Sequence, residues 1–85
     1  MLLDRYNFRN NVFDRDEHKC VICKKDAQDA HHIIERRLFT NGGYYLDNGA
    51  SLCKDCHIEA EKTLYSCNFI REKAKISNLN IFILI

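Results

Sequence analysis

The sequence predicts a small α+β domain, one unit spanning residues 1–85, built around a bound metal ion and flanked by short helices. Its 85 residues can bury only about 60 to 65% of the surface that the unfolded chain exposes, so a core of this size needs further support. Two C-x-x-C pairs, separated by 29 residues, provide that support if they bind one ion. Around them, alternating and helically spaced apolar residues predict strands and helices.

The composition indicates a folded, intracellular protein. Aromatic residues make up 11% of the chain and charged residues 29%, which argues against disorder. No run approaches the ~20 apolar residues of a membrane span, and the first ten residues lack the apolar core of a signal peptide. We therefore expect a cytoplasmic location and no membrane contact. The formal charge of +1 is weak, so binding to nucleic acid would rely on local basic groups and on metal.

Residues 5–14 are predicted to form a helix that packs on the core. Phe8 and Val12 recur at helical spacing and supply its apolar face. The opposite face carries three arginines, Arg5, Arg9 and Arg15. Basic side chains on such a face are often only solvated, but they also suit contacts with phosphates, and the sequence leaves both interpretations open.

The middle of the chain is predicted to form a hairpin with an irregular loop. Alternation assigns residues 28–34 to a strand in which His31 and His32 point to opposite faces. A Thr-Asn-Gly-Gly run then predicts a turn before a second strand at residues 44–46. The Asp-Asn-Gly run at residues 47–49 predicts a further turn with left-handed backbone angles.

Two helices and a terminal strand are expected in the rest of the chain. The first helix runs from residue 51 or 52 to 64, and His57 and Glu61 share one of its faces because they lie four residues apart. A serine N-cap predicts a second helix over residues 66 to about 76. The closing Ile-Phe-Ile-Leu-Ile run, residues 81–85, is strand-like and apolar on both faces, so it must be buried against this domain or a partner.

The four paired cysteines form the strongest motif. Two residues between the members of a pair let both thiolates reach one ion while the backbone turns. The pairs are Cys20 with Cys23, and Cys53 with Cys56. In a reducing compartment such pairs favour zinc over disulfides, and four thiolates leave no open position, so this Zn²⁺ would be structural. The remaining Cys67 is expected to be a helix-packing thiol.

Three histidines lie among the cysteines without belonging to their motif. They are His31, His32 and His57. One interpretation makes them half-buried hydrogen-bonding groups. The other makes them a catalytic centre, because phosphodiester hydrolysis needs a divalent ion on the phosphate and a base with a pKa near neutrality. We favour the second, since no paired cysteine is left to complete another structural site.

With these motifs the sequence resembles the HNH endonucleases, also called ββα-metal or His-Me finger nucleases, in the form that carries a four-cysteine zinc ribbon. The resemblance covers about residues 19–63. It implies a ββα-metal core in which His31 is a metal ligand and His32 is the general base. It also implies that Asn48 orients this base through the loop backbone, and that His57 is the metal ligand from the helix.

The acidic and basic residues near these positions complete the predicted site. Some members of the family carry a further metal-binding histidine one helical turn after the position of His57, where this sequence has Glu61. A carboxylate is a hard oxygen ligand that suits Mg²⁺ or Mn²⁺, although Glu61 can equally be an exposed helix carboxylate. The nearest basic groups in the sequence, Arg36, Arg37 and Lys54, are the expected phosphate contacts.

The sequence thus predicts a metal-dependent HNH endonuclease that hydrolyses phosphodiester bonds in DNA, with RNA as another substrate that it leaves open. The alternative is a non-catalytic zinc-ribbon module that binds nucleic acid or protein, for which the cysteines matter and His32 is dispensable. A chain this short leaves little surface for sequence-specific readout. A homodimer, or a separate targeting domain or subunit, is therefore a further expectation.

Overall fold

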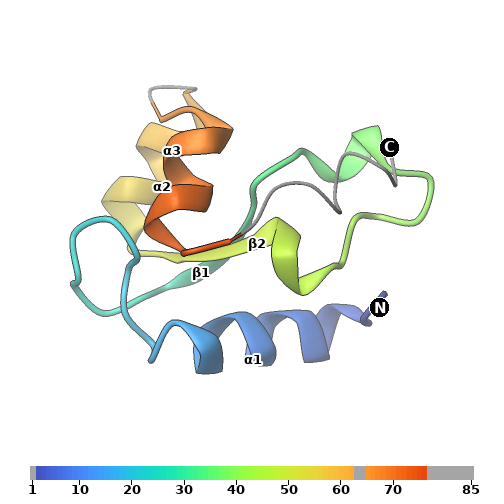
Figure 1. The fold of residues 1–85 in the computed structure, drawn as a ribbon, viewed down its shortest axis with the longest axis horizontal. Coiled ribbons are helices and arrows are strands. Elements are labelled where there is room, and N and C mark those ends of the chain that lie inside the picture. Colours follow the sequence, from blue (N-terminus) through green and yellow to red (C-terminus); the bar gives the residue numbers. More distant parts are fainter. Residues whose placement is uncertain (1, 63–64, 77–85) are drawn as a thin grey trace.

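The computed structural model describes residues 2–62 and 65–76, and Figure 1 shows their arrangement. The elements in chain order are α1 (Arg5–Arg15), β1 (Asp29–His32), η1 (Arg36–Leu38), η2 (Leu46–Asn48), β2 (Gly49–Leu52), α2 (Lys54–Glu61) and α3 (Cys67–Lys73). The two strands pair antiparallel, with α1 against one face of the sheet and α2 and α3 on the other side. This is the small α+β fold that the sequence predicts.

Helix α1 forms as predicted and packs closely on the sheet. Asp4 is its N-cap, and the Asp4 side chain accepts a hydrogen bond from the backbone N–H of Asn7 at 2.7 Å. Phe8 and Val12, one turn apart, are its buried residues. The approach is so close that a Cβ added at Gly49 would lie 2.4 Å from Val12 Cγ2. Glycine in β2 is therefore what lets α1 lie this near the strand.

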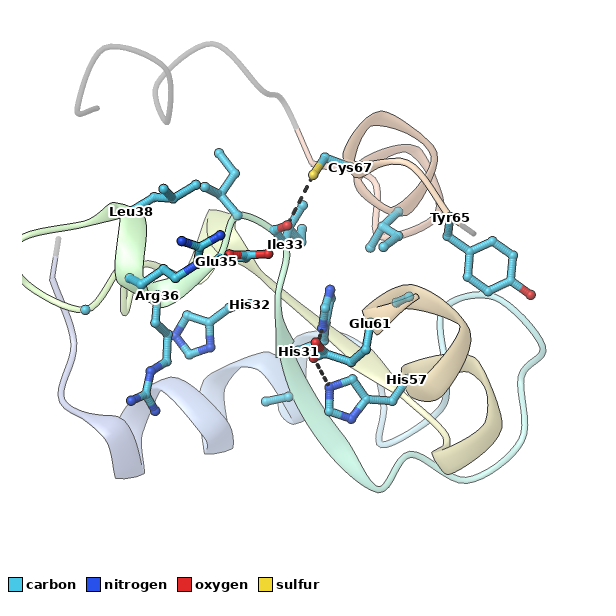
Figure 2. Close-up of a pocket in the computed structure, with 16 residues that line it drawn as sticks. His31, His32, Ile33, Glu35, Arg36, Leu38, His57, Glu61, Tyr65 and Cys67 are labelled. Carbon is cyan, nitrogen blue, oxygen red and sulfur yellow. Dashed lines mark hydrogen bonds and ion pairs between the residues drawn. The ribbon is translucent and has the colours of Figure 1, made fainter. Parts of the chain in front are cut away.

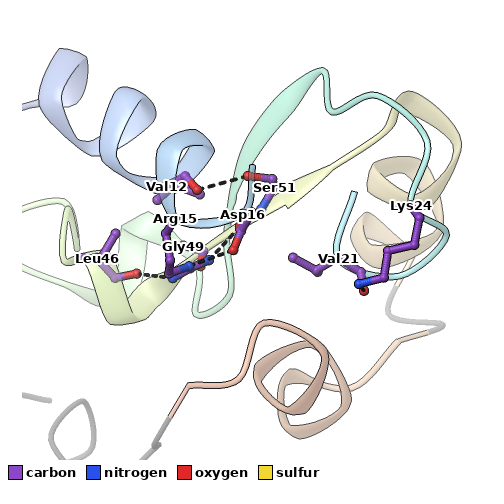
Figure 3. Close-up of polar contacts among 8 residues, drawn as sticks. All are labelled: Val12, Arg15, Asp16, Val21, Lys24, Leu46, Gly49 and Ser51. Carbon is purple, nitrogen blue, oxygen red and sulfur yellow. Dashed lines mark hydrogen bonds and ion pairs between the residues drawn. The ribbon is translucent and has the colours of Figure 1, made fainter. Parts of the chain in front are cut away.

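A polar network ties the end of α1 to β2 (Figure 3). The Arg15 guanidinium donates two hydrogen bonds to the Asp16 carboxylate, each 2.7 Å long. It also donates to the backbone oxygens of Leu46 and Gly49, at 3.0 Å and 2.8 Å. Asp16 in turn accepts from the backbone N–H of Ser51 at 2.9 Å. Arg15 is therefore a structural residue, and neither interpretation left open for the N-terminal arginines applies to it.

The register of the sheet determines where the adjacent histidines point. His31 pairs with Ala50, and His32 pairs with Gly49. Because successive side chains of a strand point to opposite faces, His31 lies on the side of α2 and His32 on the side of α1. This confirms the divergence predicted from alternation, although β1 is shorter than the predicted strand over 28–34.

The sequence-based assignment of the second strand is wrong. The strand is not at residues 44–46 but at Gly49–Leu52, and Leu46–Asn48 forms a single 3₁₀ turn. The predicted left-handed turn is also wrong at Gly49, whose φ of −120° is extended. All residues of β2 are buried, and the closeness of α1 requires small side chains there. The strand thus lacks the β-branched and aromatic residues that mark strands in a sequence.

Helix α2 begins later than predicted because its N-cap is a cysteine. Cys53 occupies the cap, and its Sγ accepts from the backbone N–H of Cys56 at 3.4 Å. The predicted start at residue 51 or 52 is therefore wrong, since these residues complete β2. The helix also ends earlier than residue 64, the predicted end, because Glu61 is its last residue and Lys62 is its C-cap.

Helix α3 confirms the predicted serine cap. The Ser66 hydroxyl accepts from the backbone N–H of Phe69 at 3.0 Å, and the helix ends at Lys73. The predicted strand at residues 81–85 lies outside the described residues, so association through it stays a prediction. Within the described residues, none of the helices combines the length and the apolar character needed to span a membrane.

Candidate active site

The four paired cysteines come together as predicted. Cys20 and Cys23 lie in the turn that precedes β1, and Cys53 and Cys56 lie at the start of α2. Their Sγ atoms are all within 4.8 Å of one another, and those of Cys23 and Cys53 are 3.5 Å apart. A tetrahedron of sulfurs around zinc, with bonds of ~2.3 Å, has sulfurs roughly 3.8 Å apart. The cluster therefore fits a structural zinc site.

The pKa shifts of the thiols differ within the cluster. Burial raises the pKa of Cys56, and the neighbouring thiols raise it further. Burial acts in the same direction at Cys20, but hydrogen bonds from the backbone at Cys23 and Cys53 outweigh it and the pKa is lowered to about 7. Cys20 therefore ionises readily near neutral pH. Zinc binds thiolates, so a bound ion would favour ionisation of the remaining thiols.

The fifth cysteine is not part of this cluster. Cys67 is exposed at the first position of α3, and its Sγ donates to the backbone oxygen of Ile33 at 3.2 Å. Its place outside the group of zinc ligands is the one predicted. Its exposure, however, differs from that of the packing thiol expected, because its hydrogen bond holds α3 to the end of β1 from the surface.

A second group of metal-competent side chains lies where β1 faces α2 (Figure 2). It consists of His31 from β1 and of His57 and Glu61 from α2, called the ligand group below. One ligand atom of each lies within 4.8 Å of the others. The Oε1 atom of Glu61 is 3.0 Å from Nε2 of His57 and 3.7 Å from Nδ1 of His31. The strand register and the four-residue helical spacing thus bring together three predicted ligands.

The electrostatics of the ligand group favour a cation between its members. His31 is 8% exposed, and its Nδ1 is a buried atom without a hydrogen-bond partner in the described part of the chain. Burial, and then the charge of His57, lowers the pKa of His31 to about 4 against the opposing effect of Glu61. Neutral His31 offers a nitrogen lone pair and Glu61 a carboxylate oxygen. Two such acceptors facing each other are stabilised when a cation lies between them.

Asp29 belongs to this site, although the sequence analysis does not single it out. Its Oδ2 atom lies 3.1 Å from Nδ1 of His57. When Nδ1 carries the ring proton and donates it to Asp29, the lone pair on Nε2 of His57 is directed toward Glu61. The available signal was alternation, since Asp29 precedes His31 by two residues and therefore shares its face of β1.

His32 lies on the opposite face of β1, against α1. Its ring stacks on Phe8, with centroids 4.5 Å apart and 22° between the planes, and meets Tyr44 edge-on at 5.0 Å. Its Nε2 is buried and has no hydrogen-bond partner among the described residues. Burial, then the charge of Arg36, lowers the pKa of His32 to about 4. The ring is therefore neutral at physiological pH. Phe8 and Tyr44 are neighbours that no motif in the sequence indicates.

Asn48 is fully buried and braces the chain that follows His32. Its Oδ1 accepts from the backbone N–H of Ile34 at 2.9 Å, and its Nδ2 donates to the backbone oxygens of Ile34 and Gly43 at 3.1 Å and 3.2 Å. Its own backbone oxygen accepts from the N–H of Ile33 at 2.9 Å. Asn48 therefore fixes the end of β1 directly after His32.

Two adjoining cavities open along β1 and η1. The larger has a volume of about 750 Å³ and is lined by the ligand group together with His32, Arg36 and Arg37. The smaller, of about 170 Å³, lies toward α1 and shares His32 and Arg36 with it. Two of the three predicted phosphate contacts thus lie at the site. Lys54, at the start of α2, lines neither cavity.

The fold and the site together define a metal-binding α+β domain. Its β1 and α2 carry the histidines of the site, and a cysteine cluster joins the segments before these two elements. The family model described as HNH endonuclease matches residues 20–63, just over half of the chain, and the protein belongs to that family. No curated protein and no solved structure matches the chain. Helices α1 and α3 lie outside the matched residues.

Proposed function

We propose that the protein is a metal-dependent endonuclease that hydrolyses phosphodiester bonds in DNA. The observation that carries the proposal is the position of two chemically different groups on the two faces of one strand. The ligand group lies toward α2, neutral His32 lies toward α1, and both line the same cavity. Phosphodiester hydrolysis needs a cation for the phosphate and a base for the water. Membership of the HNH endonuclease family supports the same reaction.

The ligand group would hold Mg²⁺ or Mn²⁺. Two imidazoles and a carboxylate form a mixed set of nitrogen and oxygen donors that accepts a hard divalent ion. When bound, such an ion supplies charge stabilisation at the phosphate and at the leaving 3′ oxygen. Asp29 would keep His57 in the tautomer whose Nε2 is available as a ligand.

His32 would accept the proton of the attacking water. Its lowered pKa of about 4 keeps the imidazole neutral and able to accept a proton throughout the physiological range, although its basicity is lower. Stacking on Phe8 orients the ring, and Asn48 braces the adjoining backbone. Because Nε2 of His32 is buried, accepting a proton there would require the ring to move, for example by a half-turn about the Cβ–Cγ bond that exchanges Nε2 with Cε1.

Arg36 and Arg37 are the proposed phosphate contacts of the larger cavity. Arg36 lies beside His32, with its guanidinium 5.9 Å from the centre of the Tyr44 ring. Arg37 pairs with Glu35 in the same turn, so it would exchange this carboxylate for a phosphate. A contact with Lys54 would require the substrate to extend beyond the cavity to the start of α2.

The second candidate is a non-catalytic zinc-ribbon module that binds nucleic acid or protein. The cysteine cluster favours it, because four thiols suffice for a closed zinc site whatever the histidines do. This candidate predicts that His32 is dispensable. A variant at His32 should keep the zinc, the fold and the binding of the wild type.

Plasmid nicking separates the two candidates. Supercoiled DNA is incubated with the wild type in Mg²⁺, Mn²⁺ or EDTA, and with His32→Ala and His18→Asn in each metal. His18 is a matched control because it is an exposed histidine, paired with Asp14 at 3.2 Å in a turn away from both cavities. Its φ of +60° is one that asparagine tolerates.

We expect metal-dependent nicking by the wild type and by His18→Asn. His32→Ala should be slower by about 10² to 10⁴, the usual effect of losing a positioned base. Equal rates for His32→Ala and the wild type would exclude His32 as the base. A wild type that binds DNA but cuts it with neither ion would favour the zinc-ribbon module.

A further inference from the structure

We infer that helix α1 forms the second wall of the substrate groove, and that Arg5 and Arg9 contact the backbone phosphates of a nucleic-acid strand there. The inference rests on the proposed function and extends it. Helix α1, Arg5–Arg15, lies outside residues 20–63, so membership of the family assigns it no role.

The smaller cavity is the groove between α1 and β1. On the α1 side it is lined by Arg5, Phe8 and Arg9. Four residues line both this groove and the larger cavity: Ala30, His32, Arg36 and His57. Because the two spaces adjoin, a strand whose scissile phosphate lies at the ligand group would continue into the groove beside α1.

Aromatic contacts hold this wall in place. Phe8 is 2% exposed, stacks on His32 and meets the Tyr44 ring edge-on at 5.5 Å. The network of Arg15 and Asp16 fastens the other end of the helix to β2. Helix α1 is thus fixed at both ends of its contact with the sheet, and the width of the groove is set by packed side chains.

The charges in the groove complement a phosphodiester backbone. Arg5 and Arg9 lie four residues apart, so they share a face of α1, and both are exposed. Arg36 adds a third guanidinium from η1. The groove also contains the carboxylate of Asp29, whose Oδ2 lies 3.1 Å from the ring of His57. The arginines therefore leave an excess of positive charge next to the site of phosphate chemistry.

The two arginines of α1 differ in their surroundings. Arg9 donates to the backbone oxygen of Gln28 at 3.1 Å, and its guanidinium lies 4.7 Å from the centre of the Phe13 ring. The side chain of Arg5 makes no hydrogen bond or ion pair with the rest of the described chain. Replacing Arg5 therefore removes a charge from the groove without removing a known contact within the fold, which makes Arg5→Gln the cleaner probe.

Salt-dependent binding to DNA tests the inference without cleavage. Fluorescence anisotropy with a short labelled duplex, and with its single strand, is measured in buffer without Mg²⁺ or Mn²⁺ over a series of salt concentrations. The proteins are the wild type, Arg5→Gln, the double variant Arg5→Gln/Arg9→Gln, and Lys73→Gln. Lys73 is the matched control, since it is exposed on α3, across the sheet from α1, and lines neither cavity.

With the probe that the wild type binds more tightly, we expect Arg5→Gln to make the negative slope of log K against log salt concentration shallower, by about 0.9 for the duplex or about 0.7 for the single strand. The double variant should make it shallower by about twice as much and weaken binding by about tenfold at low salt. Lys73→Gln should bind like the wild type.

Unchanged affinity and slope in both arginine variants would overturn the inference, as would equal losses in Lys73→Gln or a wild type that binds neither probe. Failure of the nuclease proposal looks different. A wild type that shows the arginine-dependent slope but nicks no plasmid would support phosphate contacts in the groove and contradict the nuclease proposal. Nicking by the wild type, together with normal DNA binding by the arginine variants, would support the nuclease proposal and contradict the phosphate contacts of Arg5 and Arg9.

Discussion

Asp29 contacts Nδ1 of His57, whereas Nε2 of the same ring faces Glu61. Replacing Asp29 should therefore weaken metal binding while all three members of the ligand group stay in place. We expect Asp29→Ala to lower the affinity for Mn²⁺ by about 10- to 100-fold, the usual effect of losing a carboxylate that orients a metal-binding histidine. Asp29→Asn keeps an acceptor oxygen and should recover part of the affinity. Electron paramagnetic resonance of free Mn²⁺ measures the affinities, and ¹⁵N shifts report the tautomer of His57.

The control for Asp29 is Asp26→Ala. Asp26 is an exposed carboxylate that pairs with Lys19 in the cysteine turn, so its loss should leave Mn²⁺ affinity unchanged. Wild-type affinity and an unchanged His57 tautomer in Asp29→Ala would show that the hydrogen bond does not position the ligand.

The buried histidines should make the protein less stable as the pH falls. Burial is the main cause that lowers the pKa of His31 and of His32 to about 4. A histidine in an unfolded chain has a pKa of about 6.5. Between these values the unfolded chain binds more protons, so the free energy of unfolding falls as the pH falls from about 6.5 toward 4.

The variant His32→Gln isolates one of these contributions. Near pH 5 its unfolding should take up about one proton fewer than that of the wild type, so it should lose less stability between about pH 7 and pH 5. Urea unfolding at the two pH values, with zinc and without Mg²⁺, measures this. Acid effects on the cysteine cluster are common to both proteins. Parallel losses in the two proteins would mean that His32 is not held neutral by the fold.

At the residue scale, what the sequence reveals depends on whether a residue's role follows local spacing. His57 and Glu61 are predictable as neighbours because four residues on a helix share a face. Asp29 and Phe8 acquire their positions from contacts with residues far away in the chain. Alternation places Asp29 on the face of His31, and helical spacing places Phe8 on the packed face of α1. No local pattern shows which distant residue either of them contacts.

At the scale of single elements, Gly49 sets the distance between β2 and α1. Its φ of −120° is available to any residue, so Gly49→Ala should cost stability through the contacts of its Cβ with two side chains of α1, those of Val12 and Phe8. Overpacking of this kind costs about 1 to 3 kcal/mol. Urea denaturation of Gly49→Ala measures the loss.

The same substitution in a Val12→Ala background supplies the control. Val12→Ala removes the methyl group that the new Cβ would meet at 2.4 Å, so Gly49→Ala should cost less there than in the wild type. Equal costs in the two backgrounds would show that Val12 does not limit the residue at position 49, and would leave Phe8 as the side chain of α1 that the new Cβ meets.

The same packing explains why β2 is the element that the sequence predicts least well. Residues 49–52 are all buried under neighbouring elements. Because α1 approaches so closely, the strand needs small residues in place of the β-branched and aromatic residues that usually mark a strand. Helices α1 and α3 are predicted well, since apolar residues at helical spacing mark α1 and a serine cap marks the start of α3.

At the scale of the whole molecule, the cysteine cluster joins the turn before β1 to the start of α2. We expect Cys53→Ser to lose zinc and much of its folded structure, because structural zinc contributes on the order of 10 kcal/mol to a small domain. Elemental analysis and circular dichroism measure the two effects. Cys67→Ser is the matched control and should keep its zinc, since Cys67 lies outside the cluster. A folded, zinc-free wild type would remove the structural role of the ion.

The general architecture is predictable because the cysteine spacing demands that two distant segments meet. The groove is not predictable in the same way. It arises where α1, β1 and η1 approach one another, and Arg5 and Arg9 look like ordinary solvated charges until the cavity places them beside His32. Only the three-dimensional arrangement separates them from Arg15, which the fold uses internally.

The proposal gives the two faces of β1 different roles, metal binding on the side of α2 and proton acceptance by His32 on the side of α1. Metal rescue tests these roles most directly. Single-turnover cleavage of saturating plasmid DNA is measured over a range of Mn²⁺ concentrations for the wild type, His57→Ala and His32→Ala. The rate of His57→Ala should recover at high Mn²⁺, because a missing ligand weakens metal binding. The rate of His32→Ala should stay about 10² to 10⁴ below that of the wild type at every concentration, because metal does not replace a base. Wild-type cleavage by His32→Ala, or its full recovery with added Mn²⁺, would contradict the account.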